Sequence, residues 1–181
     1  NRFILDYQCI TLKHFTPMSI NLINILRKSF SDKSYADISQ HVGISPESTK
    51  NGLKAIIPNV LAAILWNNTL NSSSEPTWWN ALDGEYPYSD DEFVQTENIT
   101  NTTFLVKGRE VVSGMFRTNH DELVSSVSSV AGIQKEKAAG LIEVGVPIIA
   151  GHLKNWMKRK NWKFTDLIEN LNENKGIITG V

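Results

Sequence analysis

The stretch VGISPESTKNGLKAIIP, residues 42–58, is matched in pattern 89 residues later by AGIQKEKAAGLIEVGVP, residues 131–147. In both stretches a glycine precedes a proline by fifteen positions. Apolar residues also recur with the same spacing of 89 residues in and around these stretches. The pairs are Ile38 and Val127, Leu53 and Ile142, Ile57 and Val146, Val60 and Ile149, and Ile64 and Leu153. A repeat that keeps its apolar positions preserves a core, so the pattern predicts two related helical modules and says little about chemistry.

Local signals within residues 42–58 predict where helices end and begin. Gly43 follows a short amphipathic segment at the position where a helix C-terminus favours a residue that tolerates positive φ. Ser45-Pro46-Glu47 then combines an N-cap hydroxyl, a proline suited to the first helical position, and an acid near the positive end of the helix dipole. Pro58 lacks an amide donor, so we expect this helix to bend or restart there.

The second copy is predicted to follow the same plan with weaker end signals. A helix is expected over residues 134–144, and Pro147 is expected to introduce a further apolar segment. A final short helix over residues 165–171 is predicted to begin with Thr165 as its N-cap. Three glycines in this copy are unfavourable in exposed helices and therefore indicate close approach between helices: Gly140, Gly145 and Gly151.

These signals predict an all-α chain. Residues 18–68 and 108–181 are the two modules, of about three or four helices each, and are expected to pack together. Residues 69–107 form a long irregular connector, a kind of segment that is often functional. Residues 1–17 fit neither module and lack the pattern of a signal peptide. We interpret them as an extension upstream of a start at Met18, although they could also form a strand or a helical arm.

The connector differs in composition from the modules. Trp78-Trp79 is typical of a short apolar plug or a single helical turn, and an acidic and aromatic segment that includes residues 90–92 follows it. A run between Lys154 and Lys163, near the C-terminus, carries the opposite charge. We interpret both as solvated surfaces, because exposed ion pairs contribute only about 0–1 kcal/mol. The alternative is that the two surfaces meet, within one molecule or between copies.

Overall composition bounds the class of protein. An apolar content of 41% with 20% charged residues is ordinary for a globular chain. The formal net charge of −1 removes the general electrostatic argument for nucleic-acid binding and leaves only a local patch to support it. Cys9 is the only cysteine, so neither an internal disulfide nor a cysteine-rich zinc site can form. No apolar run reaches the length of a transmembrane helix.

A helix-turn-helix is the one nucleic-acid signal in the sequence. Residues 36–50 have its spacing, and the second helix would carry Ser48, Thr49, Asn51 and Lys54 into a major groove. That helix offers few cations and runs directly into an apolar segment, whereas phosphate neutralisation needs several. We therefore favour a structural role. If Lys50, Lys54 and the basic run shared one face, the nucleic-acid hypothesis would gain.

Catalytic and metal sites are not indicated. The four histidines are scattered, and none is within helical reach of another. His41 fits a helix C-terminus, where positive charge is favourable, and His152 replaces Ala63 of the first copy, which suggests a half-exposed site. Residues 90–92 lack the spacing of a calcium loop. We expect no enzymatic activity, no cofactor and no metal.

The chain from Met18 onward resembles the YidB-like bacterial family known as domain of unknown function 937, in the two-module version found at the N-terminus of some Bacteroidetes envelope proteins. In those proteins an OmpA-like peptidoglycan-binding domain can follow. The resemblance is carried by residues 19–22, 42–45, 52–61 and 140–151. It implies an all-α fold and brings no catalytic residues. The Trp78-Trp79 plug and its acidic tail depart from the family pattern.

The sequence therefore predicts a non-enzymatic protein-interaction or scaffold domain, acting through a partner protein or self-association. It indicates no small-molecule ligand, and the resemblance implies the cytoplasm or the envelope of a bacterium. The alternative is a nucleic-acid-binding module that uses the helix-turn-helix segment. The candidate interaction residues, on the assumption that the tryptophans are exposed, are Trp78, Trp79, Tyr86, Tyr88, Lys158, Arg159 and Lys160.

Overall fold

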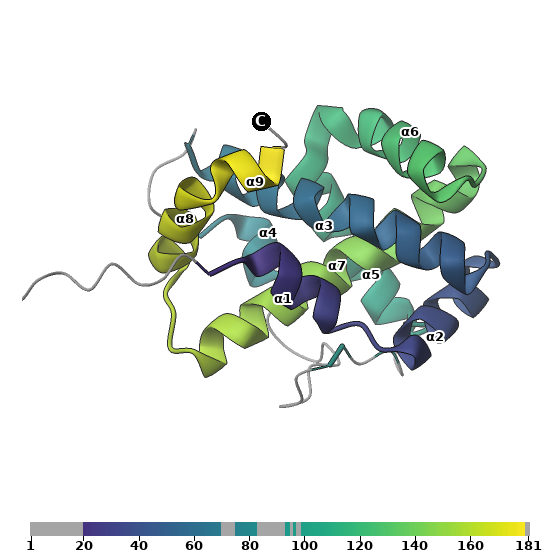
Figure 1. The fold of residues 1–181 in the computed structure, drawn as a ribbon, viewed down its shortest axis with the longest axis horizontal. Helices are drawn as coiled ribbons and strands as arrows, with labels where there is room; N and C mark the ends of the chain where they lie inside the picture. Colours follow the sequence, from purple (N-terminus) through teal and green to yellow (C-terminus); the bar gives the residue numbers. More distant parts are fainter. Residues whose placement is uncertain (1–19, 70–74, 83–92, 95, 97–98, 180–181) are drawn as a thin grey trace, which may run out of the picture.

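The computed structural model describes residues 20–69, 75–82, 93–94, 96 and 99–179 (Figure 1). Every regular element in these ranges is helical, which confirms the predicted all-α class. The α-helices are α1 (Leu22–Lys28), α2 (Asp32–Val42), α3 (Pro46–Thr69), α4 (Thr77–Asn80), α5 (Thr102–Phe116), α6 (His120–Ala131), α7 (Lys135–Arg159), α8 (Phe164–Glu173) and α9 (Lys175–Thr179). A short 3-10 turn, Arg117–Asn119, joins α5 to α6.

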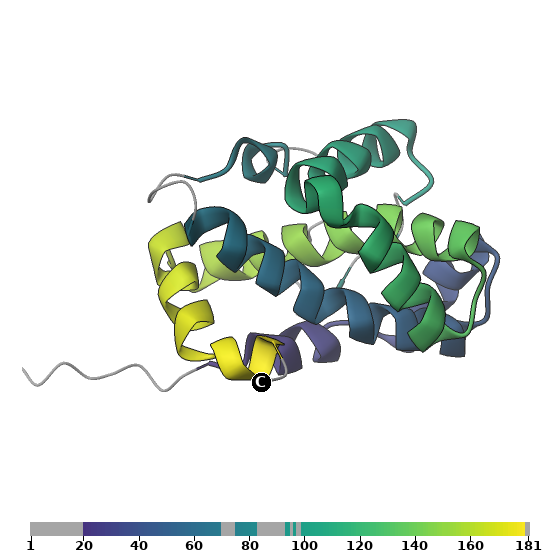
Figure 2. The same ribbon diagram turned by 90° about the horizontal axis from the view of Figure 1, so that it is seen from above.

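The two long helices, α3 and α7, lie at the centre of the fold and pack against each other. Figure 2 shows α1 and α9 on one side of this pair and α4 and α5 on the other. At one end α2 packs against both long helices, and at the opposite end α8 packs against α3 (Figure 1). One continuous hydrophobic core runs through all of these helices.

The five pairs of apolar residues that recur in the repeat are buried. Each of the ten side chains in the five pairs is at most 1% exposed. Gly43 and Gly132 both end a helix in the left-handed conformation, with φ of 73° and 65°. Helices from the two halves nevertheless share one core, since α3 packs against α6 as well as α7. The division into two modules therefore stays a prediction.

The predicted start of α3 is confirmed. The Ser45 hydroxyl accepts a hydrogen bond from the Ser48 amide at 3.0 Å, as an N-cap does, and the helix begins at Pro46. The prediction for the start of α8 is wrong, because its N-cap lies two residues before the predicted one. This helix begins at Phe164, and the Asp166 carboxylate accepts a hydrogen bond from the Lys163 amide at 2.7 Å, so Lys163 and not Thr165 is the N-cap.

The two prolines do not divide their helices, contrary to the expectation of a restart. Both α3 and α7 run through them without a break. Beside Pro58, the Asn59 side-chain amide donates to the Ala55 carbonyl at 2.8 Å and so adds a bond next to the one that proline cannot make. At Pro147, α5 approaches the opened turn closely, since a Cβ on Gly108 would lie 3.0 Å from the Glu143 carbonyl oxygen. Packing thus compensates for the local disruption.

Close helix approach is confirmed at Gly145 and absent at Gly140. A Cβ on Gly145 would lie 2.8 Å from Leu53 Cδ2 and 3.4 Å from Ile56 Cδ1. Both of these side chains are buried and have little room to move. A Cβ on Gly140 would meet only Val42, at an ordinary contact distance of 3.6 Å. Gly140 and Gly145, both in α7, therefore form a matched pair for a packing test.

Gly145→Ala is expected to lower the free energy of unfolding by about 1–3 kcal/mol, because the added methyl overpacks the contact between α3 and α7. Gly140→Ala makes the same chemical change in the same helix. It is expected to leave stability unchanged or raise it by up to about 1 kcal/mol, because alanine loses less entropy in a helix. Urea unfolding followed by circular dichroism measures both. Equal effects of the two substitutions would contradict the close approach at Gly145.

Candidate interaction groove

Trp78 and Trp79 form the helical turn α4 and belong to the core. Their side chains are 6% and 1% exposed. The Trp79 ring makes edge contacts with Trp78 and with Phe164 of α8, at centroid distances of 5.7 and 5.2 Å. Trp78 packs against α5 at Gly114, where an added Cβ would come within 2.7 Å of it. The plug predicted from the sequence is thus present, and the expectation that these tryptophans are exposed is wrong.

Lys154 holds α4 in place and does not contribute to a basic surface. It is 8% exposed and donates a hydrogen bond to the Trp79 carbonyl at 2.8 Å. Its amine also lies 5.5 Å from the centroid of the Trp79 ring, within the range of a cation–π contact. The first lysine of the predicted basic run is therefore buried and stabilises the packing of α4. The cations that remain on the surface are at the end of α7 and beyond it.

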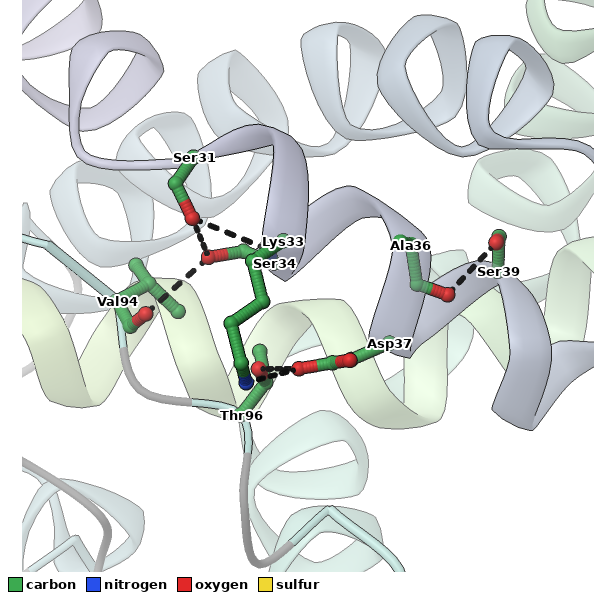
Figure 3. Close-up of polar contacts among 8 residues, drawn as sticks. All are labelled: Ser31, Lys33, Ser34, Ala36, Asp37, Ser39, Val94 and Thr96. Carbon is green, nitrogen blue, oxygen red and sulfur yellow. Dashed lines mark hydrogen bonds and ion pairs between the residues drawn. The ribbon is translucent and has the colours of Figure 1, made fainter.

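The end of the connector is fastened to α1 and α2. The Val94 amide donates to the Ser29 carbonyl at 2.8 Å, and the Ser34 hydroxyl donates to the Val94 carbonyl at 3.2 Å. Two residues further on, the Thr96 hydroxyl donates to the Asp37 carboxylate, as Figure 3 shows. These bonds fix the backbone on the C-terminal side of Phe93. That side chain is nevertheless 52% exposed.

Asp37 is the charged member of this anchor. Its carboxylate pairs with Lys33 at 2.7 Å, one turn earlier in α2 (Figure 3). The hydrogen bond from Lys33, followed by that from Thr96, holds the pKa of Asp37 below its ordinary value. The carboxylate is therefore ionised at neutral pH and available as an acceptor for the connector.

Phe93 stands at the edge of a hollow of about 480 Å³ between α1 and the end of α7. We name this hollow the basic groove. Its lining side chains come from three segments that lie far apart in the sequence: Ile25, Lys28, Phe93, His152, Trp156, Arg159 and Lys160. Trp156 is held in place by Trp162, with ring centroids 5.0 Å apart. The groove thus combines an apolar floor with three cations, Lys28, Arg159 and Lys160, all of them exposed.

His152 lies inside the groove and is only 4% exposed, so the half-exposed site suggested by the repeat is wrong. Burial, and then the neighbouring charge of Arg159, lowers its pKa from 6.5 to about 4. The imidazole is therefore neutral at physiological pH. A neutral imidazole has one N–H donor and one acceptor nitrogen.

The structure separates the predicted site residues. Arg159 and Lys160 line the basic groove, and Lys158 is exposed on the last turn of α7. Trp78 and Trp79 are internal, and Tyr86 and Tyr88 lie outside the described residues.

The lysines of the helix-turn-helix hypothesis do not join this site. Lys50 lies 5.7 Å from the centroid of the Tyr35 ring, and Lys54 is 3.4 Å from the Asn51 side-chain oxygen. Neither lines the basic groove. These two lysines are therefore not part of the cluster of cations at the groove.

Other surface features carry less chemistry. A second hollow of about 790 Å³ lies between α3, the end of α5 and α6, with Trp66 at 53% exposure on its rim. Among the described residues, no group of three or more His, Cys, Asp or Glu side chains could hold a metal ion. In the same part of the chain, none of the helices combines the length and the apolar character needed to cross a membrane.

Sequence reasoning missed Phe93, His152 and Trp156 as site residues. No spacing rule connects residue 25, residue 93 and residues 152–160, because the fold alone brings them together. The available signal was weak. It was a histidine in an otherwise apolar helix segment, followed within two turns by three consecutive cations.

Comparison with known proteins gives a family and no activity. Searches of curated proteins and of solved structures found no significant match. A family of bacterial proteins matches residues 24–155, which covers most of the chain and includes α2, α3, α5 and α6 and nearly all of α7. The resemblance to this family seen in the sequence is therefore confirmed, without its YidB-like and two-module details. The chain belongs to the family described as bacterial protein of unknown function (DUF937).

Proposed function

We propose that this chain is a non-enzymatic protein-interaction domain and that the basic groove receives part of a partner protein. The observation that carries the proposal is the exposure of Phe93 at the rim of the groove, although the chain next to it is fastened to α1 and α2. Aromatic side chains and arginine are enriched in protein interfaces, and both occur in this groove, as Phe93, Trp156 and Arg159. A rigid backbone limits the entropy that Phe93 loses when it is covered.

Charge reversal at the groove is the direct test. Lys28→Glu combined with Lys160→Glu changes two exposed cations that come from different segments of the lining. We expect this variant to lose at least tenfold in affinity for the partner, because two attractive charges at the interface become repulsive. The partner is obtained by crosslinking and mass spectrometry from the native host. Its affinity for the purified chain is then measured by calorimetry.

The matched control is Lys54→Glu combined with Lys135→Glu. Both residues are exposed, the change in net charge is the same, and neither lines the basic groove. Lys135 begins α7, about 36 Å along the helix from Arg159. The control is expected to bind like the wild type. Equal losses in both variants would contradict a role for the groove, and a loss in the control alone would favour the helix-turn-helix surface.

A further inference from the structure

The His152 imidazole makes no hydrogen bond to any described residue. In the described part of the chain, the only fully enclosed side-chain polar atom without a partner is Asn68 Oδ1, so neither imidazole nitrogen is completely enclosed. His152 lines the basic groove, and its accessible surface therefore opens into it. An imidazole that opens into the groove and makes no hydrogen bond within the described part of the chain is available to bond a ligand there.

Charge in the groove selects the sign of that ligand. From α1 the group facing His152 is Lys28, and from the end of its own helix and just beyond they are Arg159 and Lys160. Phe93, on the connector side, brings no charge. No carboxylate occurs among the described residues that line the groove, and in the described part of the chain neither Lys28 nor Lys160 forms an ion pair. The complementary ligand is therefore an anion.

The apolar part of the lining indicates that the ligand also carries an apolar group. Ile25, Phe93 and Trp156 form the uncharged part of the lining, and the Trp156 ring is fixed by its contact with Trp162. A free inorganic anion would leave this surface exposed to water. An acidic side chain next to an aromatic or aliphatic one would cover both parts of the groove. Three cations in a chain of net charge −1 are too few for a nucleic-acid site of ordinary affinity.

We propose that the basic groove binds an acidic, aromatic-bearing peptide segment of the partner protein, and that a carboxylate of this segment accepts a hydrogen bond from the His152 imidazole. This inference rests on the proposed interaction function and specifies the class of partner. The carboxylate lies between the imidazole and the cations of the rim, and the neighbouring aromatic side chain packs against Phe93 and Trp156. The groove is open at its rim, where Lys28, Phe93 and Lys160 are exposed.

The proposed contact makes binding depend on pH. Without ligand, His152 is neutral above its pKa of about 4. A carboxylate beside the imidazole favours the protonated form and raises this pKa, so peptide binding takes up a proton. If the pKa in the complex reaches about 6, binding is about fourfold tighter at about pH 5.5 than at about pH 7.5. The peptide carboxylates stay ionised over this range.

Fluorescence anisotropy with a labelled synthetic peptide, Asp-Asp-Phe-Glu-Asp-Leu, tests the inference on the full chain. The control peptide, Asn-Asn-Phe-Gln-Asn-Leu, has the same shape without charge. We expect the acidic peptide to bind, the amide peptide to bind at least tenfold more weakly, and the affinity to rise as the pH falls. His152→Gln is expected to remove the pH dependence while binding persists. Circular dichroism establishes that the variant is folded.

Histidine titration by nuclear magnetic resonance in the wild type gives a second readout that needs no folded variant. The His152 resonance is expected to titrate at higher pH when the acidic peptide is present. Binding that is independent of pH, or an unchanged His152 titration, would overturn the inference and leave the interaction function intact. Failure of the groove charge reversal to affect partner binding would instead overturn the proposed function. Preference for a single-stranded DNA oligomer over the peptide would overturn the inference as well.

Discussion

Replacing Trp79 with alanine is expected to lower the free energy of unfolding by about 3–5 kcal/mol. The side chain is 1% exposed and fills the space between Trp78, Phe164 and Lys154. Truncation removes these contacts and leaves a cavity beside a lysine that is itself 8% exposed. Since small domains are stable by only about 5–15 kcal/mol, a loss of this size brings the chain close to unfolding. Urea unfolding followed by circular dichroism measures the change.

Trp66→Ala is the matched control for this prediction. It removes the same side chain at a position that is 53% exposed, where the Lys175 amine lies 5.2 Å from the ring centroid. An effect of at most about 1 kcal/mol is expected there. Similar losses at both positions would contradict the assignment of Trp79 to the core. A binding defect caused by Trp79→Ala would report unfolding, so this tryptophan cannot serve as a probe of an interaction surface.

Local chemistry explains which features could be predicted from the sequence. The helix ends at Gly43 and Gly132 and the helix start at Ser45 and Pro46 were predictable, because a helix cap depends on residues within a single turn. Whether a proline interrupts its helix could not be predicted from such local signals. Pro147 is tolerated inside α7 because Gly108, from another helix, packs against the opened turn.

The lining of the basic groove could also be predicted only in part from the sequence. Arg159 and Lys160 were identifiable from a charge run, whereas their neighbours Phe93 and Lys28 are about 65 and 130 residues away in the sequence. Trp79 illustrates the opposite error. A tryptophan in a connector is often a surface feature, but here Lys154 and α8 enclose it. Burial is a property of tertiary packing, and no local pattern determined it.

The second large effect is a loss of stability in mild acid that depends on His152. The unfolded chain binds a proton at this residue near pH 6.5, whereas the folded chain does so only near pH 4. Between these values the unfolded state holds more protons, so stability rises with pH and falls as the pH decreases from 6.5 to 4. The total is about 3 kcal/mol. Urea unfolding at several pH values measures this slope.

His152→Gln is expected to flatten the slope, because glutamine does not titrate. Asp37, whose pKa is lowered from 3.8, adds its own loss of stability in acid, but this loss is common to the wild type and to His152→Gln, so the difference between their slopes reports His152. The same slope in the wild type and in His152→Gln would contradict the buried, neutral His152. A bound acidic peptide would raise the His152 pKa and reduce the acid sensitivity, because protonation would then strengthen a contact in the folded state. Acid stability and peptide binding are thus two measurements of the same imidazole.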